Sequence, residues 1–144
     1  MASIYTLTVT CVSGLVLRSE CERTIEIEAS SSLEELHLAI QQAVRFDNDH
    51  LYDFYLANTP RGDKQMLVAQ DEFAPEEADY SAVPLESVFP TGRKRLYYLF
   101  DYGDHWLFEI RKARGEKEAE RRVHYPRVVA KKGPNPEQYP GSDW

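Results

Sequence analysis

The chain is poor in the features that cross-link, anchor or export a protein. It has two cysteines in 144 residues, Cys11 and Cys21, and a chain of this length can bury a core without disulfides or a metal. It has no apolar run near the roughly 18 residues that a membrane helix needs, and no basic stretch followed by an apolar one at its N-terminus. We therefore expect a reduced, cytoplasmic protein with no membrane association. We expect one domain over residues 1–132 and a Pro/Gly-rich tail over residues 133–144.

The sequence also lacks the local motifs of the common enzyme classes. It contains no Gly-rich phosphate loop, no Ser/His/Asp nucleophile elbow, no CxxC pair and no HExxH helix. No catalytic residue, metal site or cofactor is assigned on these grounds, and we favour a protein that is not an enzyme.

Positive charge is scarce except in one segment. The chain carries 17 Lys and Arg against 24 Asp and Glu, a net charge of −7, which disfavours binding to nucleic acid. Residues 1–110 hold eight basic and nineteen acidic residues, whereas residues 111–132 hold nine basic and three acidic ones. A solvated charged face is the favoured interpretation of that segment, and a phosphate-binding strip is the alternative. The candidate residues for the strip are Arg111, Lys112, Arg114, Arg121 and Arg122.

Two periodicities predict an α+β fold. Residues 4–12 alternate apolar residues with threonine, and residues 24–28 alternate isoleucine with polar residues, so we expect an antiparallel pair of half-buried strands. Ser32 followed by Glu35 matches a capping box. The helix that begins there carries its apolar residues at helical spacing and extends to about Phe46.

The most specific stretch is residues 97–110, in which two aromatic-rich strands meet at an acidic turn. We expect Gly103 to adopt positive φ in that turn. A last edge strand is predicted over residues 123–129, and residues 71–79 are predicted to be irregular. The expected architecture is α+β: a mixed, mainly antiparallel sheet with one long helix packed on a face in a β-grasp-like core, followed by the C-terminal aromatic hairpin and an irregular tail.

Histidines and aspartates gather near the end of the predicted helix. His37, Asp47, Asp49 and His50 are residue types that could ligate a divalent metal, and a metal-dependent hydrolase would use His37 and His50. The alternative is structural and is favoured: His37 is hydrogen-bonded at the margin of the core, and His50 caps a turn.

The hairpin tip gives a second candidate group. Asp101 and Asp104 could perform acid–base chemistry if their environments separated their pKa values, but aspartate is also common in turns because its carboxylate accepts nearby amides. Turn chemistry is the favoured interpretation, and Trp106 is expected to anchor the core. The candidate binding residues from both groups are His37, Asp49, His50, Asp101, Asp104 and Trp106.

Three parts of the sequence carry a family resemblance. The first is residues 36–44 followed by 49–54, the second is residues 99–106, and the third is residues 125–129 followed by 133–137. Together they resemble the plasmid pRiA ORF-three-like family, also called insertion-element passenger proteins of TnpR type. The resemblance implies a small α+β domain encoded on plasmids, mobile elements and chromosomes, and it implies no established activity.

The chain departs from this family in its last part. Many relatives carry cysteines there, whereas this chain has no cysteine after Cys21. If relatives bind a metal through those thiolates, this protein cannot do so in the same way.

The sequence as a whole favours a non-enzymatic cytoplasmic interaction module with an unidentified protein partner. One alternative is a nucleic-acid accessory protein of mobile elements that uses residues 111–132. The other is the metal-dependent hydrolase that would use the histidines.

Overall fold

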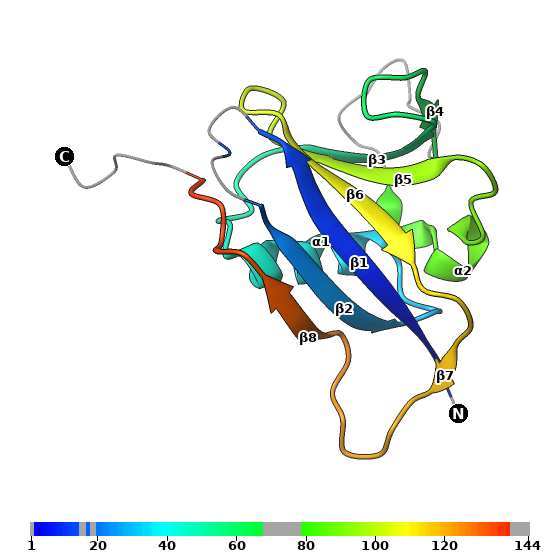
Figure 1. Ribbon diagram of the computed structural model, residues 1–144. Helices are drawn as coiled ribbons and strands as arrows, with labels where there is room; N and C mark the ends of the chain where they lie inside the picture. The colour runs from blue at the N-terminus through cyan, green and yellow to red at the C-terminus, as the bar shows by residue number, and fades with distance from the viewer. Residues whose placement is uncertain (1, 15–16, 18–19, 68–78, 139–144) are drawn as a thin grey trace.

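The core of the fold is one antiparallel sheet. The computed structural model describes residues 2–14, 17, 20–67 and 79–138 (Figure 1), so most of the segment 71–79 lies outside the described residues. Within them the strand order is β4-β3-β5-β6-β1-β2-β8, and β7 pairs with one end of β1. The expectation of a mixed sheet is wrong for these strands, because every pair between them is antiparallel. The strands are β1 Ser3–Ser13, β2 Glu22–Glu28, β3 Tyr52–Ala57, β4 Gln65–Met66, β5 Arg95–Phe100, β6 Trp106–Lys112, β7 Lys117–Glu118 and β8 Arg127–Lys132.

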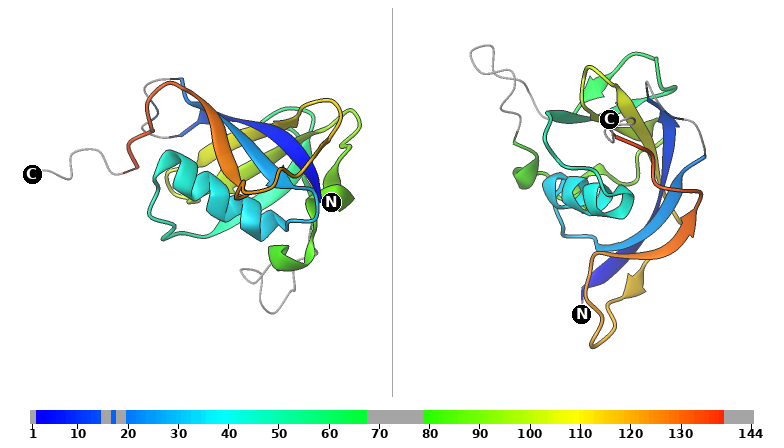
Figure 2. Two further views of the ribbon diagram at one scale, coloured as in Figure 1. Left: turned by 90° about the horizontal axis from the view of Figure 1, so that it is seen from below. Right: turned by 90° about the vertical axis from the view of Figure 1, so that its left-hand side faces the viewer.

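One long helix covers one face of the sheet, as the sequence predicts. Helix α1 spans Leu33–Val44, and the short helices η1 (Tyr80–Ala82) and α2 (Leu85–Val88) lie beyond it in the chain. Figure 2 shows α1 on a single side of the curved sheet, with β8 at the margin of the sheet. The main core fills the space between α1 and the sheet.

The first two strands follow their sequence pattern. Tyr5 pairs with Ile27 and Leu7 with Ile25, and all four side chains are buried. The threonines between the apolar residues of β1 are half-buried on the opposite face. Period-two alternation places one set of side chains on each face of a strand, which confirms the predicted antiparallel pair.

Helix α1 begins at the predicted cap and ends slightly early. The Ser32 hydroxyl accepts a hydrogen bond from the Glu35 backbone N–H at 3.1 Å, which satisfies one of the free amides of the first turn. Arg45 takes a left-handed conformation with φ 60° and ends the helix after Val44. Phe46, the predicted end, instead leaves the helix and packs its ring 5.1 Å from that of Trp106.

The turn between β5 and β6 differs from the prediction. It covers residues 101–105, and positive φ falls on Asp101 and His105, whereas Gly103 is not among the residues with positive φ. The Asp101 carboxylate accepts the Gly103 and Asp104 amides at 3.1 and 3.3 Å. Aspartate tolerates the left-handed region when its side chain bonds the following amides, so Asp101 takes the role expected of the glycine.

The last strand is displaced from its predicted position. Strand β8 is an edge strand, but it covers Arg127–Lys132 instead of residues 123–129. Arg127 pairs with Glu26 in the register of β2, and its Nε lies 2.7 Å from the Glu26 carboxylate. That ion pair begins the strand, and no periodicity in the sequence marks it.

A buried arginine joins three distant parts of the chain. Arg23 of β2 is 1% exposed. Its guanidinium donates to the carbonyls of Ala43 in the last turn of α1 and Lys132 at the end of β8, and to the side chain of Asn135 at 2.7 Å. Carbonyl oxygens at a helix C-terminus favour a cation. Arg23 thus connects the sheet, the helix and the C-terminal segment.

The C-terminal segment passes very close to the backbone just before β2. Gly133 has φ +81°, and a Cβ there would lie 1.8 Å from the Glu20 carbonyl oxygen. Further along, the Gln138 side chain accepts from the Asp47 N–H at 2.7 Å and donates to the Asp49 carboxylate at 2.9 Å. Residues 133–138 therefore lie against the body, and the division of the chain at residue 132 remains a prediction.

We predict that Arg23→Met destabilises the protein by about 2–4 kcal/mol, because methionine fills the space and leaves the acceptors at Lys132 and Asn135 without their donor. Urea unfolding followed by circular dichroism measures this change. Arg121→Met removes the same charge at an exposed position and should change stability by less than about 0.5 kcal/mol. Equal effects of the two substitutions would show that Arg23 has no special structural role.

We predict that Gly133→Ala disturbs the C-terminal segment more than Gly115→Ala does. Both glycines have positive φ, so the backbone strain of alanine is similar, about 1 kcal/mol at each site. Only Gly133 faces another backbone, whereas nothing lies within 4 Å of a Cβ at Gly115. Amide hydrogen exchange at Asp47, which bonds Gln138, should accelerate in the first variant alone. Unchanged protection there would contradict the close approach.

Candidate functional site

The predicted site residues lie around the end of the sheet formed by β3, β5 and the turn after β5. His37 comes from α1, Asp49 and His50 come from the loop before β3, and Asp101 and Asp104 come from the turn. The structure brings His50 together with both Asp49 and Asp101, at 3.5 and 3.3 Å from the imidazole Nε2 to the carboxylate oxygens. His37 belongs to a different set of contacts.

His37 is part of a closed ring of hydrogen bonds. The Gln41 side-chain amide donates to the Tyr98 hydroxyl at 2.9 Å, and that hydroxyl bonds His37 Nδ1. The Asn48 side chain bonds the imidazole, and the Asn48 backbone N–H returns to Gln41 Oε1 at 3.0 Å. Each member of the ring thus bonds the next, and the imidazole is held between them.

Burial controls the charge of His37. The side chain is 3% exposed, and its ring stacks on Tyr52 at 3.7 Å between centroids. Desolvation lowers the pKa of His37 to about 4, and the hydrogen bond to Asn48 opposes this shift. At neutral pH the imidazole is uncharged, and the ring already bonds Tyr98 and Asn48. The contacts of His37 therefore favour the structural interpretation, in which it is a hydrogen-bonded residue of the core margin and not a metal ligand.

Asp101 is held by the turn that it forms. It is 7% exposed; one carboxylate oxygen accepts the amides of the turn and the other faces His50. The Asp104 backbone N–H is one of those donors, so the two aspartates meet through a backbone amide. Asp101 thus has the expected structural role, in which its carboxylate accepts the amides of the turn.

A second carboxylate in this region ties the turn to β3. Asp53 accepts hydrogen bonds from the Tyr80 hydroxyl at 2.9 Å and the Tyr102 hydroxyl at 2.8 Å. Tyr80 also accepts the Phe54 N–H at 3.1 Å. Burial and the neighbouring Asp53 raise the pKa of both tyrosines, so both hydroxyls stay protonated and keep donating.

Trp106 lies in the core, as expected. It is 0% exposed and packs against Phe46, and a Cβ at Gly14 would lie 2.3 Å from its ring. Its indole N–H has no hydrogen-bond partner among the residues that the structure describes. The ring is covered, so a base or other planar ligand has no access to it.

The metal hypothesis lacks its geometry in the described part of the chain. His37 and His50 both contact the ring of Phe100, at 6.3 and 5.8 Å between centroids, while His37 bonds Tyr98 and His50 faces Asp49 and Asp101. No group of three or more His, Cys, Asp or Glu side chains within residues 2–14, 17, 20–67 and 79–138 could hold a metal ion.

The candidate nucleic-acid residues divide into two groups. Arg111, Lys112 and Arg114 lie at the end of β6, where Arg111 pairs opposite Thr8 of β1. Arg121 and Arg122 follow β7, which pairs with the first residues of β1. The basic segment is therefore not one continuous strip.

Sequence reasoning missed three contributors to this region. Gln41 and Asn48 complete the ring around His37, and Gln138 reaches Asp49 from the far end of the chain. Gln41 lies one helical turn after His37, and an i, i+4 pair on one helix face is a signal that could have been used. Nothing in the local sequence marks Gln138.

Fold and site together define a small α+β domain with an antiparallel sheet and one helix that covers it. The polar side chains around His37 bond to one another inside this domain. The chain belongs to the plasmid pRiA4b ORF-3-like protein family, whose model matches residues 4–142. This confirms the family resemblance carried by the sequence.

Two similar proteins are uncharacterised. The uncharacterized protein y4hQ of Sinorhizobium fredii is 31% identical over 90 residues, which are 62% of this chain and 44% of that protein, so the match spans less than half of its length. A crystal structure of a protein of unknown function, MM3350 from Methanosarcina mazei Go1, superposes with a TM-score of 0.74 at 21% identity. The superposition covers 94% of this chain and 72% of the MM3350 chain. This likeness shows a shared fold. No helix among the described residues combines the length and apolar character needed to cross a bilayer.

We predict that stability falls as the pH drops from about 7 to 4, in part through His37. The folded pKa of about 4 lies below the ordinary value of 6.5, so the unfolded chain binds the extra proton between these values. The contribution of His37 to the free energy of unfolding is complete above pH 6.5, the pKa of the unfolded state. Up to about 3 kcal/mol of that contribution is lost by pH 4. Urea unfolding at pH 7.5 and 4.5 measures the loss.

The matched variant is His37→Gln, which keeps a hydrogen-bonding side chain without a titrating ring. Its stability should depend less on pH than that of the wild type, whatever its absolute value. His50→Gln serves as a second control for the imidazole beside Asp101. A pH dependence that His37→Gln leaves unchanged would show that His37 is not buried as a neutral ring.

Proposed function

We propose that this protein is a non-enzymatic interaction module that binds an extended, acidic segment of a partner protein along the outer edge of β8. The proposal includes the cytoplasmic setting and the association with mobile elements that the sequence suggests. The buried thiols of Cys11 and Cys21, both free, are compatible with a reducing compartment.

The observation that carries the proposal is the edge position of β8. Among the described strands β8 ends the sheet and pairs only with β2. An edge strand presents unpaired backbone N–H and C=O groups, to which an extended peptide can add as a further strand. Val128 and Val129 are 46% and 44% exposed, so this edge also offers apolar side chains to an added strand.

A groove beside this edge offers contacts for side chains. A cavity of about 130 Å³ lies between α1 and β8, lined by Ile25 and Val128 from the sheet and by Ala39 and Ala43 from the helix. Small alanines on the helix leave room for an apolar side chain of an added strand. Strand addition provides affinity through the main chain, and a pocket of this kind provides selectivity.

Charge favours an acidic partner over a second copy of this chain. The last two residues of β8, Lys131 and Lys132, are exposed, and Lys132 lies 3.4 Å from the exposed carboxylate of Glu20. Two β8 edges placed side by side would bring like charges together, which is destabilising. An acidic strand meets this edge with complementary charge.

The polar residues around His37 and Asp101 support the non-enzymatic part of the proposal. Their hydrogen bonds are made to other residues of the chain, and the imidazole of His37 is neutral and enclosed. A catalytic acid or base must reach a proton of the substrate, and these groups are engaged within the fold.

We predict that display of random twelve-residue peptides on the immobilised protein selects acidic sequences in which β-branched residues alternate. Binding of a selected peptide should weaken about tenfold or more in the double variant Val128→Asp and Lys131→Glu, since both changes oppose an acidic strand. Arg121→Glu, a charge reversal at an exposed site outside β8, is the matched control. Thermal unfolding checks that each variant is folded.

Strand addition has a second readout in the backbone. Amide exchange in β8 should slow when the peptide binds, because the outward N–H groups gain partners. Peptides that bind equally well to both variants, or that leave exchange in β8 unchanged, would overturn the proposal.

A further inference from the structure

The two cysteines of the chain lie opposite each other on neighbouring strands. The ladder between β1 and β2 runs as far as Thr10, which pairs with Glu22. One residue further on, the Cys11 N–H donates to the Cys21 carbonyl at 2.9 Å. The antiparallel register therefore continues, and Cys11, in β1, is paired with Cys21, which directly precedes β2.

Residues paired in this way are close enough for a disulfide. The Cα atoms of a directly opposed, hydrogen-bonded pair in an antiparallel ladder are about 5.5 Å apart, and disulfides join Cα atoms that are about 4.4–6.8 Å apart. Opposed side chains also point to the same face of a sheet. Both cysteines belong to the main core between the sheet and α1, so their sulfur atoms share that face.

The surroundings of the two thiols differ in charge. Burial, together with the nearby Cys21, raises the pKa of Cys11 to about 12, so Cys11 stays a thiol at neutral pH. Burial also raises the pKa of Cys21, but the positive charges of Arg23 and Lys131 oppose that rise. Because the thiolate is the reactive form of cysteine, Cys21 is the better nucleophile of the pair.

The C-terminal segment, residues 133–138, borders the pair. Gly133 follows β8 directly, and a Cβ there would lie 3.5 Å from the Cys21 Cα. Further along, the Asn135 side chain accepts a hydrogen bond from Arg23 at 2.7 Å, and Figure 1 shows the segment passing the end of α1. Both thiols are buried, so the position of this segment bears on the access of an oxidant.

We propose that Cys11 and Cys21 are a redox pair, closed to an intramolecular disulfide by a peroxide and reopened by a thiol reductant, and that the C-terminal segment limits the rate of closure. In a reducing compartment the pair stays open at rest and closes under an oxidative challenge. The proposal does not depend on the binding at β8 or on its partner.

The closure is a two-electron oxidation in two steps. The Cys21 thiolate attacks one oxygen of hydrogen peroxide, the O–O bond breaks, and Cys21 becomes a sulfenic acid while hydroxide leaves and takes up the proton lost by the thiol. The Cys11 thiol then attacks the sulfenic sulfur, the S–O bond breaks, and the Cys11 proton leaves with the hydroxyl group as water. Two thiols and one peroxide thus give one disulfide and two waters.

The geometry favours this disulfide over the other products of oxidation. A sulfenic acid on Cys21 has the Cys11 thiol beside it, and a reaction partner held in place reacts far faster than one in solution. Condensation should therefore outrun further oxidation of the sulfenic acid. Two chains cannot bring these sulfur atoms together, because both are buried in the core.

The test exposes the reduced protein to hydrogen peroxide at neutral pH, followed by unfolding in iodoacetamide and digestion. Trypsin cuts after Arg18, between the two cysteines. We expect the peptide with Cys11 joined to the peptide with Cys21, at a mass lower by two hydrogen atoms than the two reduced peptides together, and dithiothreitol should separate them. Oxygen added to Cys21 without joined peptides, or a disulfide between two chains, would overturn the proposal.

Serine variants test the order of attack. Cys11→Ser should leave a sulfenic acid on Cys21, which dimedone labels, whereas Cys21→Ser should leave Cys11 as a thiol. Dimedone labelling of Cys11 alone would contradict the roles given to the two sulfur atoms.

The role of the C-terminal segment has its own variant. Asn135→Ala removes the bond to Arg23 and should speed closure about fivefold, the factor by which losing one hydrogen bond raises the population of an open state. Asn58→Ala, in an exposed loop after β3, is the matched control and should leave the rate unchanged. Equal rates in the two variants would overturn the role of the segment.

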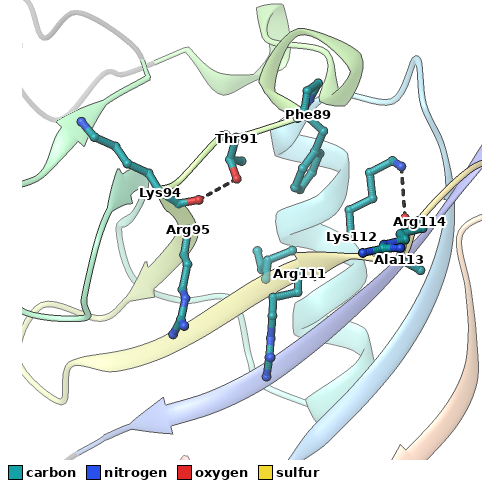
Figure 3. Close-up of a pocket in the computed structure, with 11 residues that line it drawn as sticks. Phe89, Thr91, Lys94, Arg95, Arg111, Lys112, Ala113 and Arg114 are labelled. Atoms are coloured by element: carbon teal, nitrogen blue, oxygen red, sulfur yellow. Dashed lines mark hydrogen bonds between the residues drawn. The ribbon is translucent and has the colours of Figure 1, made fainter.

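The other end of β1 supplies a control within the molecule. A cavity lined by Phe89, Thr91 and Ala113 lies there (Figure 3), since the Ala113 N–H bonds the Thr6 carbonyl. On closure, amide chemical shifts should move around the cysteines and stay unchanged around this cavity. Equal changes at both ends would show general damage by the peroxide and would argue against a local disulfide.

Discussion

The buried guanidinium of Arg23 is the interaction on which the arrangement of the other elements depends. It lies on the helix side of β2, 1% exposed, and bonds carbonyls from α1 and β8 and the side chain of Asn135. A buried charge without hydrogen bonds is costly, so the end of the helix and the C-terminal segment must both stay in place. The same constraint positions Gln138 beside Asp49 and so shapes the predicted site.

Much of the fold was predictable because its signals are local. The alternation in β1, the cap at Ser32 and the aromatic pattern of residues 97–110 each reflect contacts between residues close in sequence. Predictions failed where one distant contact decides the outcome. Strand β8 begins at Arg127 because of Glu26, which lies in β2, and the turn uses Asp101 because its carboxylate bonds the following amides.

The sequence allowed the residues of the candidate site to be named, but it did not predict which of them contact one another. Proximity of His50, Asp49 and Asp101 required the loop and the turn to meet, which no spacing encodes. The ring around His37 depends on Tyr98, 61 positions away. Similarly, the closeness of Arg95 to Arg111 was not predicted, because Arg95 precedes the basic segment and lies beside Arg111 only through the register of β5 and β6.

Burial separates the polar residues of this protein by role. His37, Arg23 and Asp101 are enclosed, and their donors and acceptors are used by the fold. Arg111, Arg114 and Lys131 are exposed and keep capacity to bind something else. Residue type alone pointed to the first group, since histidine and aspartate are the usual agents of chemistry. Accessibility points to the second, because an exposed group whose donors are not used by the fold can still bond a ligand. The proposed binding of a partner at the edge of β8 uses residues of this second, exposed kind.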